Sequence, residues 1–281
     1  MMDESRDTSF SDDSADNAQG LYMHPSSDPD RDLFGNAPKN SSDWEHRRGE
    51  PRVFTLLWMI YLMGATVLMF SSMATAISIS TEVTRPAART MLIIVAVGFS
   101  VLWPMVRFSQ RALDSAHVRF ALRDALVLSV PMQAIIWPQT LPVLANWSIE
   151  VVAAISAFFI AWIFILAGVQ AFASQSIQRN KGSELVRATW MMIIILLVFG
   201  APIFGSITAL GVESTVSQPR VGWMLSPITG LLEIIRNRDE LGSNAQVFSE
   251  HWRVIIALLC VGGALLLVAK ANEVARARFQ A

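Results

Sequence analysis

The four histidines are the side chains of this sequence best suited to bind a metal ion or to transfer a proton near neutral pH. They are His24, His46, His117 and His251, and no two of them have the close spacing of zinc ligands. Ser100 and Ser206 lie in apolar stretches, where no histidine is available to activate a hydroxyl as a nucleophile. The sequence therefore predicts no metal site, no cofactor, no catalytic residue and no enzymatic activity.

Charged side chains are absent from the interior of six apolar stretches. The acidic and basic residues nearest to these stretches stand at their ends: Glu82, Asp124, Glu150, Glu184 and Lys270. A charge at the centre of a bilayer costs at least about 2.5 kcal/mol and marks proton relays and ion sites. The sequence thus disfavours, without excluding, a proton- or sodium-coupled carrier, and it disfavours a channel with charged rings.

Nucleotide and nucleic-acid binding find no support in the sequence either. It contains no GxxxxGK[ST] loop, so we predict that the chain does not bind ATP by that route. The arginines lie beside the apolar stretches and not on one nucleic-acid-binding face, so no nucleic-acid partner is expected. The only cysteine is Cys260, which leaves no intrachain disulfide to form.

The length of the apolar stretches predicts an all-α, polytopic integral membrane protein. Of 281 residues, 53% are hydrophobic and only 16% are charged, and about 18 apolar residues suffice for a transmembrane helix. We predict six transmembrane helices, at about residues 53–78, 90–106, 120–140, 150–173, 188–211 and 252–271. These helices form one transmembrane domain over residues 51–275, which we expect to be embedded in a lipid bilayer. Residues 276–281 are predicted to form a cytoplasmic C-terminal tail.

Residues 1–50 predict a disordered, acidic cytoplasmic tail. They hold twelve acidic and five basic residues, a net charge of −7, and few large apolar side chains. Such a segment cannot bury enough apolar surface to offset the entropy of ordering. We favour a solubilising linker over a docking or regulatory tail, because nothing in it resembles a defined recognition mode.

The distribution of basic residues predicts the orientation of the helices. With both termini inside, the cytoplasmic segments hold sixteen basic residues and the external segments hold six. Because cytoplasmic loops carry the excess of Lys and Arg, both termini are predicted to be cytoplasmic. The expected location is the cell membrane, meaning the plasma or inner membrane.

Residues 107–124 are the most informative polar stretch. Four arginines recur in it at multiples of four residues: Arg107, Arg111, Arg119 and Arg123. On a helix these positions stay close to one face, beside an apolar row. We predict an amphipathic helix at the cytoplasmic surface. Its arginines either contact lipid headgroups, which the pattern favours, or form a docking surface for a cytoplasmic partner.

Residues 226–236 predict a short helix between the last two spans. Ser226 suits the N-cap and Pro227 the first helical position. The apolar residues Ile228, Leu231, Leu232 and Ile235 then follow at the spacing of one helix face. Eleven residues cannot cross a bilayer, so we expect an interfacial or re-entrant helix.

Two patterns concern the third and fourth spans. Three prolines between residues 131 and 142 predict an interruption of the third span. It is either a helix opened toward a substrate or, as we prefer, a loop at the outer end of the span. On the fourth span, Ala153, Ala157 and Ala161 form a row of small residues that predicts close packing against another helix.

The layout resembles the membrane subunits of type-2 ABC exporters. The resemblance covers residues 53–275 as an architecture: six spans, a basic link after the second span, and a short helix begun by Ser226 and Pro227 between the last two. It implies that residues 107–124 contact a separate cytoplasmic ATPase subunit. It also implies that residues 226–236 re-enter the membrane from outside.

The sequence therefore supports two alternative functions. The first is a permease subunit of an ABC-type exporter, supported by the span layout and the uncharged span interiors. The alternative is a non-transporting membrane scaffold or assembly protein, supported by the polar tail and the alanine row. Under either function, the chain could form a homodimer.

Overall fold

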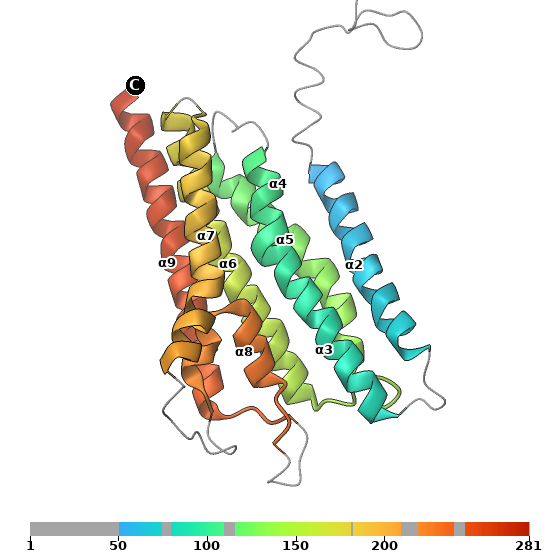
Figure 1. Ribbon diagram of the computed structural model, residues 1–281. Helices are drawn as coiled ribbons and strands as arrows, with labels where there is room; N and C mark the ends of the chain where they lie inside the picture. The colour runs from blue at the N-terminus through green and yellow to red at the C-terminus, as the bar shows by residue number, and fades with distance from the viewer. Residues whose placement is uncertain are drawn as a thin grey trace, which may run out of the picture. The chain divides into compact units, whose positions relative to one another are not determined.

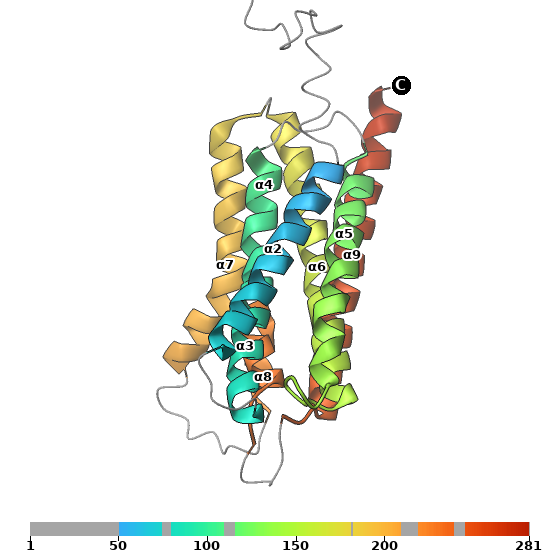
Figure 2. The same cartoon turned by 90° about the vertical axis from the view of Figure 1, so that its right-hand side faces the viewer.

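The longest buried helix of the fold is α6 (Ile149–Arg179), and the other helices are arranged around it (Figures 1 and 2). Its N-cap is Ser148, whose side chain accepts a hydrogen bond from the Val151 N–H at 3.4 Å. Arg179 stands in the last turn, where a cation is favoured by the helix dipole. In this computed structural model, α6 packs along its length against α5 and α9.

The structure describes residues 51–74, 80–109, 116–180, 182–208, 219–238 and 245–280. The predicted tail of residues 1–50 lies outside the described residues. In chain order the elements are α2 (Pro51–Met73), α3 (Thr81–Val97), the π-helical turn η2 (Gly98–Leu102), α4 (Trp103–Ser109), α5 (His117–Ile136), the 3₁₀ turn η3 (Trp137–Thr140), α6, α7 (Glu184–Thr208), the 3₁₀ turn η5 (Val221–Leu225), α8 (Pro227–Ile234) and α9 (Ser249–Gln280).

Among the described residues, six helical segments are long and apolar enough to cross a membrane, which confirms the predicted all-helical class with six helices of that length. They are Phe54–Met73, Thr81–Ser109, His117–Thr140, Ile149–Arg179, Glu184–Ala201 and Ser249–Arg278. The second of them joins α3, η2 and α4 into one segment. Neighbouring segments run in opposite directions, so the end of α4, the start of α5, the end of α6 and the start of α7 share one end of the bundle (Figure 1). The α8 helix lies at the other end (Figure 1).

Several helices extend further than the sequence predicts, and α3 and α9 do so most. The helix expected to begin near residue 90 begins at Thr81, and its first turn is already closed by bonds from Val83 and Thr84 to the Ser80 carbonyl. Charged residues can remain in this helix because Arg85 and Arg89 find acceptors inside the protein. The last helix continues to Gln280, so the residues predicted as a C-terminal tail are mostly helical.

The predicted amphipathic helix over residues 107–124 is wrong as a continuous helix. The α4 helix ends at Ser109, and α5 begins only at His117. Ala116, immediately before α5, has the left-handed backbone conformation, with φ of 63°, which a continuous right-handed helix does not allow. The stretch therefore belongs to the ends of two helices that run in opposite directions.

The predicted interruption of the third span is confirmed. The α5 helix runs through Pro131 and then tightens into η3 at Trp137. The Leu141 N–H closes this turn on the Pro138 carbonyl at 2.9 Å. The change falls at the end of the segment, as expected of a loop between two spans.

Two glycines, Gly168 of α6 and Gly262 of α9, lie where these two helices approach each other closely. A side chain at Gly168 would place its Cβ 2.6 Å from the Leu265 Cβ, and one at Gly262 would come within 2.9 Å of the Ile165 backbone nitrogen. The Gln175 amide also donates to the Ala269 carbonyl of α9 at 3.0 Å. Ala161 of the alanine row is fully buried, while Ala153 and Ala157 are partly exposed.

The first helix, α2, is attached to the bundle through aromatic side chains. The Trp58 indole N–H donates to the Leu128 carbonyl at 3.2 Å, and the Tyr61 hydroxyl donates to the Ile94 carbonyl at 2.7 Å. The two rings stack at 5.4 Å. Each aromatic residue thus packs an apolar body against the bundle and satisfies its polar atom within the protein.

The α6–α9 contact predicts opposite effects for two adjacent glycines. We expect Gly262→Ala to lower the free energy of unfolding by about 1–3 kcal/mol, because the new Cβ collides with the α6 backbone. Gly263→Ala is the matched control. Its Cβ would meet nothing within 4 Å, so it should be neutral or slightly stabilising in a helix. Thermal unfolding in mild detergent measures both, and equal midpoints would contradict the assignment.

Candidate functional site

The short helix α8 begins as the sequence predicts. The Ser226 side chain accepts a hydrogen bond from the Ile228 N–H at 3.3 Å, and Pro227 occupies the first helical position. With eight residues, α8 is roughly 12 Å long and too short to cross a bilayer. The cap and the proline fix where the helix starts and therefore which of its residues face the bundle.

The predicted apolar face of α8 packs against protein. Leu231 and Ile235 are buried, Leu232 is partly exposed, and the helix contacts α3, α6 and α7. Gly230 permits this approach, because a Cβ there would collide with the Phe158 ring of α6. The interfacial or re-entrant placement of α8 in a membrane remains a prediction.

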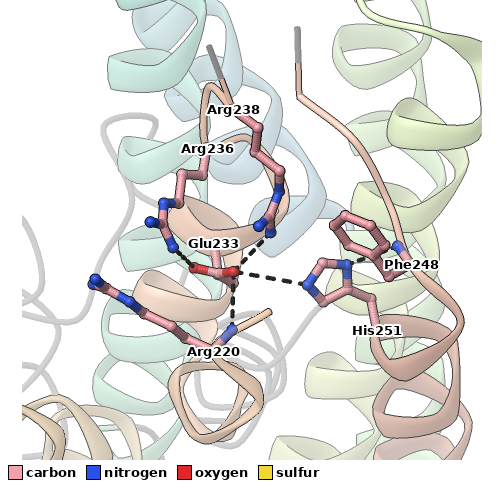
Figure 3. A network of polar contacts seen from close by, with 6 residues as sticks. All are labelled: Arg220, Glu233, Arg236, Arg238, Phe248 and His251. Carbon is pink, nitrogen blue, oxygen red and sulfur yellow. Dashed lines mark hydrogen bonds and ion pairs between the residues drawn. The ribbon is translucent and has the colours of Figure 1, made fainter. Parts of the chain in front are cut away.

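A buried carboxylate, Glu233, is the centre of a polar cluster on α8 (Figure 3). Its Oε1 accepts hydrogen bonds from the Arg220 backbone N–H at 3.1 Å and from the Arg238 guanidinium at 2.8 Å. The Arg236 Nη1 lies 3.6 Å from Oε2, and the His251 Nε2 lies 3.8 Å from Oε1. One carboxylate thus contacts the segment before η5, the segment after α8, and α9.

The ring of His251 is oriented by its other nitrogen. Nδ1 accepts a hydrogen bond from the Phe248 N–H at 3.1 Å, next to the start of α9. In the neutral ring the proton is therefore on Nε2, which faces Glu233. At 3.8 Å this contact is electrostatic and too long for a hydrogen bond. The fully buried Arg238 also stacks on the Phe248 ring at 4.8 Å, so the cluster has an apolar wall.

The α3 helix contributes a second set of contacts to this end of the bundle. Arg89 donates to the Ile235 carbonyl at 2.8 Å and to the Asn237 side-chain oxygen at 2.5 Å, which holds the end of α8. Arg85 donates to the Ala145 carbonyl at 3.0 Å, which holds the α5–α6 link. Both arginines precede the second predicted span, at residues 90–106, and both join segments of the fold.

The charges around Glu233 decide its protonation state. Burial by itself raises the pKa of the Glu233 carboxyl, but His251, the Arg220 N–H, Arg238 and Arg236 together hold that pKa below its ordinary value of 4.5. The carboxylate is therefore ionised at neutral pH. It acts as a hydrogen-bond acceptor, and its bonds join segments of the chain that are distant in the sequence.

A separate buried ion pair lies at the α4–α5 end. Arg107 of α4 forms a two-point contact with Asp124 of α5, and the Trp103 indole N–H donates to the same carboxylate at 3.3 Å. The Arg107 guanidinium also lies 4.7 Å from the centre of the Phe54 ring. Nearby, the His117 Nε2 and the Gln178 Oε1 are hydrogen-bonded at 2.7 Å, which ties the start of α5 to α6.

The four arginines predicted to form one surface do not share an environment. Arg107 is mostly buried in its ion pair, whereas Arg119 and Arg123 are exposed. Arg111 lies outside the described residues. Sequence reasoning missed Glu233, although an acidic residue inside the apolar run of α8 was a signal that it has partners.

No protein-family model, curated protein or solved structure matches this chain.

The Arg107–Asp124 pair predicts strong destabilisation when one partner is removed. We expect Asp124→Ala to cost about 3–5 kcal/mol, because it leaves a largely buried guanidinium without this carboxylate. Combining Arg107→Met with Asp124→Leu should recover much of the loss. The exposed neighbour gives the control Arg123→Ala, for which a change below about 0.5 kcal/mol is expected. Unfolding in mild detergent that ranks the two alanine variants equally would contradict this role.

The lowered pKa of Glu233 predicts an acid-dependent stability. A carboxyl with a lower pKa in the folded state stabilises the fold above its ordinary pKa of 4.5, and this contribution is lost as the pH falls through the folded value. Glu233→Gln should therefore unfold at a lower temperature than the parent at pH 7. Below pH 4.5 the two melting curves should converge, and a constant gap down to pH 3 would show that the charge of Glu233 is not what stabilises this end.

Proposed function

We propose that this chain is the permease subunit of an exporter of the type-2 ABC class, powered by a separate ATPase subunit. The observation that carries the proposal is the placement of α8. Helix α8, between α7 and α9 in the chain, packs on the bundle at one end, while the end of α4, the start of α5 and the end of α6 lie at the other (Figures 1 and 2). A permease of this class needs a segment at the outer end and a docking face at the inner end.

The positions of the acidic residues support an external energy source. In the described spans these residues lie within eight residues of a helix end: Glu82, Asp124, Glu150, Glu184, Glu250 and Glu273. The most deeply buried of them, Asp124, is paired with Arg107. A carrier driven by protons or sodium usually has a carboxylate at the middle of the membrane, and none is present among the described residues of these helices.

The same proposal assigns a side to each end of the bundle. The α4–α5 end carries exposed basic residues: Arg119, Arg123, Arg179, Arg276 and Arg278. Under the positive-inside rule this end faces the cytoplasm of a cell membrane, and α8 faces outward. Arg119 and Arg123 are then the side chains of α5 available to a cytoplasmic ATPase, whereas Arg107 is occupied within the bundle.

Copurification tests the proposed docking surface. We expect the full-length chain, purified in mild detergent from its native host, to retain a nucleotide-binding subunit in a near one-to-one ratio. Arg119→Glu combined with Arg123→Glu should reduce that recovery at least tenfold, because both charges on the docking face are reversed. The matched control is Arg276→Glu with Arg278→Glu, which reverses two exposed charges at the same end of the bundle.

Each outcome of this experiment decides between the two functions. Selective loss of the subunit in the α5 variant supports the permease. Recovery of the chain without a nucleotide-binding subunit, under conditions that preserve known membrane complexes, would instead favour the scaffold or assembly protein. Equal loss in both double variants would show that total charge, and not the α5 surface, governs the association.

A further inference from the structure

We propose that the buried Gln170 carboxamide of α6 is a binding site for a small uncharged molecule that carries a hydroxyl group. The inference goes beyond the proposed transport function and does not require it. It rests on a polar side chain inside the bundle that is not part of the contacts described above.

Gln170 is buried in the longest helix of the core without a hydrogen bond from the protein. Only 4% of it is exposed, and its side chain forms no hydrogen bond with the residues that the structure describes. The other two glutamines of α6 are both anchored: Gln175 donates to the Ala269 carbonyl at 3.0 Å. Gln178 is hydrogen-bonded to His117 at 2.7 Å. A buried amide oxygen without a donor costs free energy, and a bound molecule that supplies the donor removes this cost.

The hydrogen bond between His117 and Gln178 fixes the depth of Gln170 in the bundle. It joins the start of α5 to the end of α6, and the two helices run in opposite directions from it (Figure 1). At about 1.5 Å per residue, Gln170 lies roughly 12 Å from this contact along α6. Asp124 lies roughly 10 Å from it along α5. The carboxamide of Gln170 is therefore at nearly the same depth as the buried Arg107–Asp124 pair.

The helical repeat of α6 gives the side of the helix on which Gln170 lies. At about 100° per residue, Gln170 is about 20° around the helix from Phe159. The Phe159 ring packs edge-on against Phe99 of η2, with 5.1 Å between the ring centres. Gly168, which faces α9, is about 160° away from Gln170. Gln170 therefore faces away from α9 and toward the side of α6 that η2 and α4 contact.

The charges at this depth favour an uncharged ligand. Arg107 and Asp124 form an ion pair, so their opposite charges compensate each other. A charged ligand beside them would bring an additional charge into an apolar interior, where an uncompensated charge is costly. A hydroxyl group supplies the hydrogen-bond donor that the Gln170 oxygen lacks, and it carries no charge.

Thiol labelling of the full-length chain in lipid nanodiscs tests the site. In a Cys260→Ser background, Leu166→Cys places a reporter at a fully buried position one helical turn before Gln170, on the same side of α6. The probe is 2-hydroxyethyl methanethiosulfonate, which is uncharged and carries a hydroxyl group. We expect Gln170→Leu to slow labelling at position 166 at least tenfold, because leucine has a similar volume and lacks the amide.

Two controls separate the amide from a general change in packing. Met132→Cys places the same reporter at a fully buried position of α5, and Gln170→Leu should leave labelling there unchanged. The trimethylammonium analogue of the probe has a similar length and a positive charge. It should label position 166 at the same rate whether residue 170 is glutamine or leucine.

Three results would overturn the site. An unchanged rate at position 166 would show that the Gln170 amide admits nothing larger than water. Equal slowing at positions 166 and 132 would show that Gln170→Leu acts on packing throughout the bundle. Equal slowing with the charged and the uncharged probe would show that the amide does not select uncharged molecules. No ATPase takes part in this experiment, so its outcome is independent of the proposed function.

Discussion

The constraint on which this structure depends is that apolar helices exclude water, so each charged or polar group among them needs a partner within the protein. The Arg107–Asp124 pair satisfies it at one end, and the contacts of Glu233 and Arg89 satisfy it at the other. Trp58 and Tyr61 satisfy it along α2 by donating to backbone carbonyls. The charges therefore collect near the helix ends, where they join segments that are distant in the sequence.

The buried charged groups are paired in different ways at the two ends of the bundle. At the α4–α5 end, the buried pair is local to two helices and leaves Arg119 and Arg123 free of it and exposed. At the α8 end, one carboxylate, Glu233, has partners from several segments of the chain. An exposed basic face and a closed polar cap are suited to different tasks.

The sequence predicts those features that depend on local pattern. Length and hydropathy identify the six long helices, and Ser226 with Pro227 identifies the start of α8. What it does not predict depends on partners far along the chain. Arg107 has the spacing of a surface residue, but Asp124 draws it inward, and Glu233 is unremarkable until Arg220 and His251 are brought to it. Likewise, glycines and alanines are equally plausible packing residues until α9 is placed on α6.

The long helices differ in how much of their surface is buried inside the protein. In the most apolar window of α6, 78% is buried inside the protein, compared with 11% for α7 and 22% for the last helix. Helix α6 is therefore the fixed element, and its contacts with α5 and α9 must persist if the fold is to survive. Helix α8 is attached to the bundle by its apolar face, by the contacts of Glu233 and by the two hydrogen bonds from Arg89.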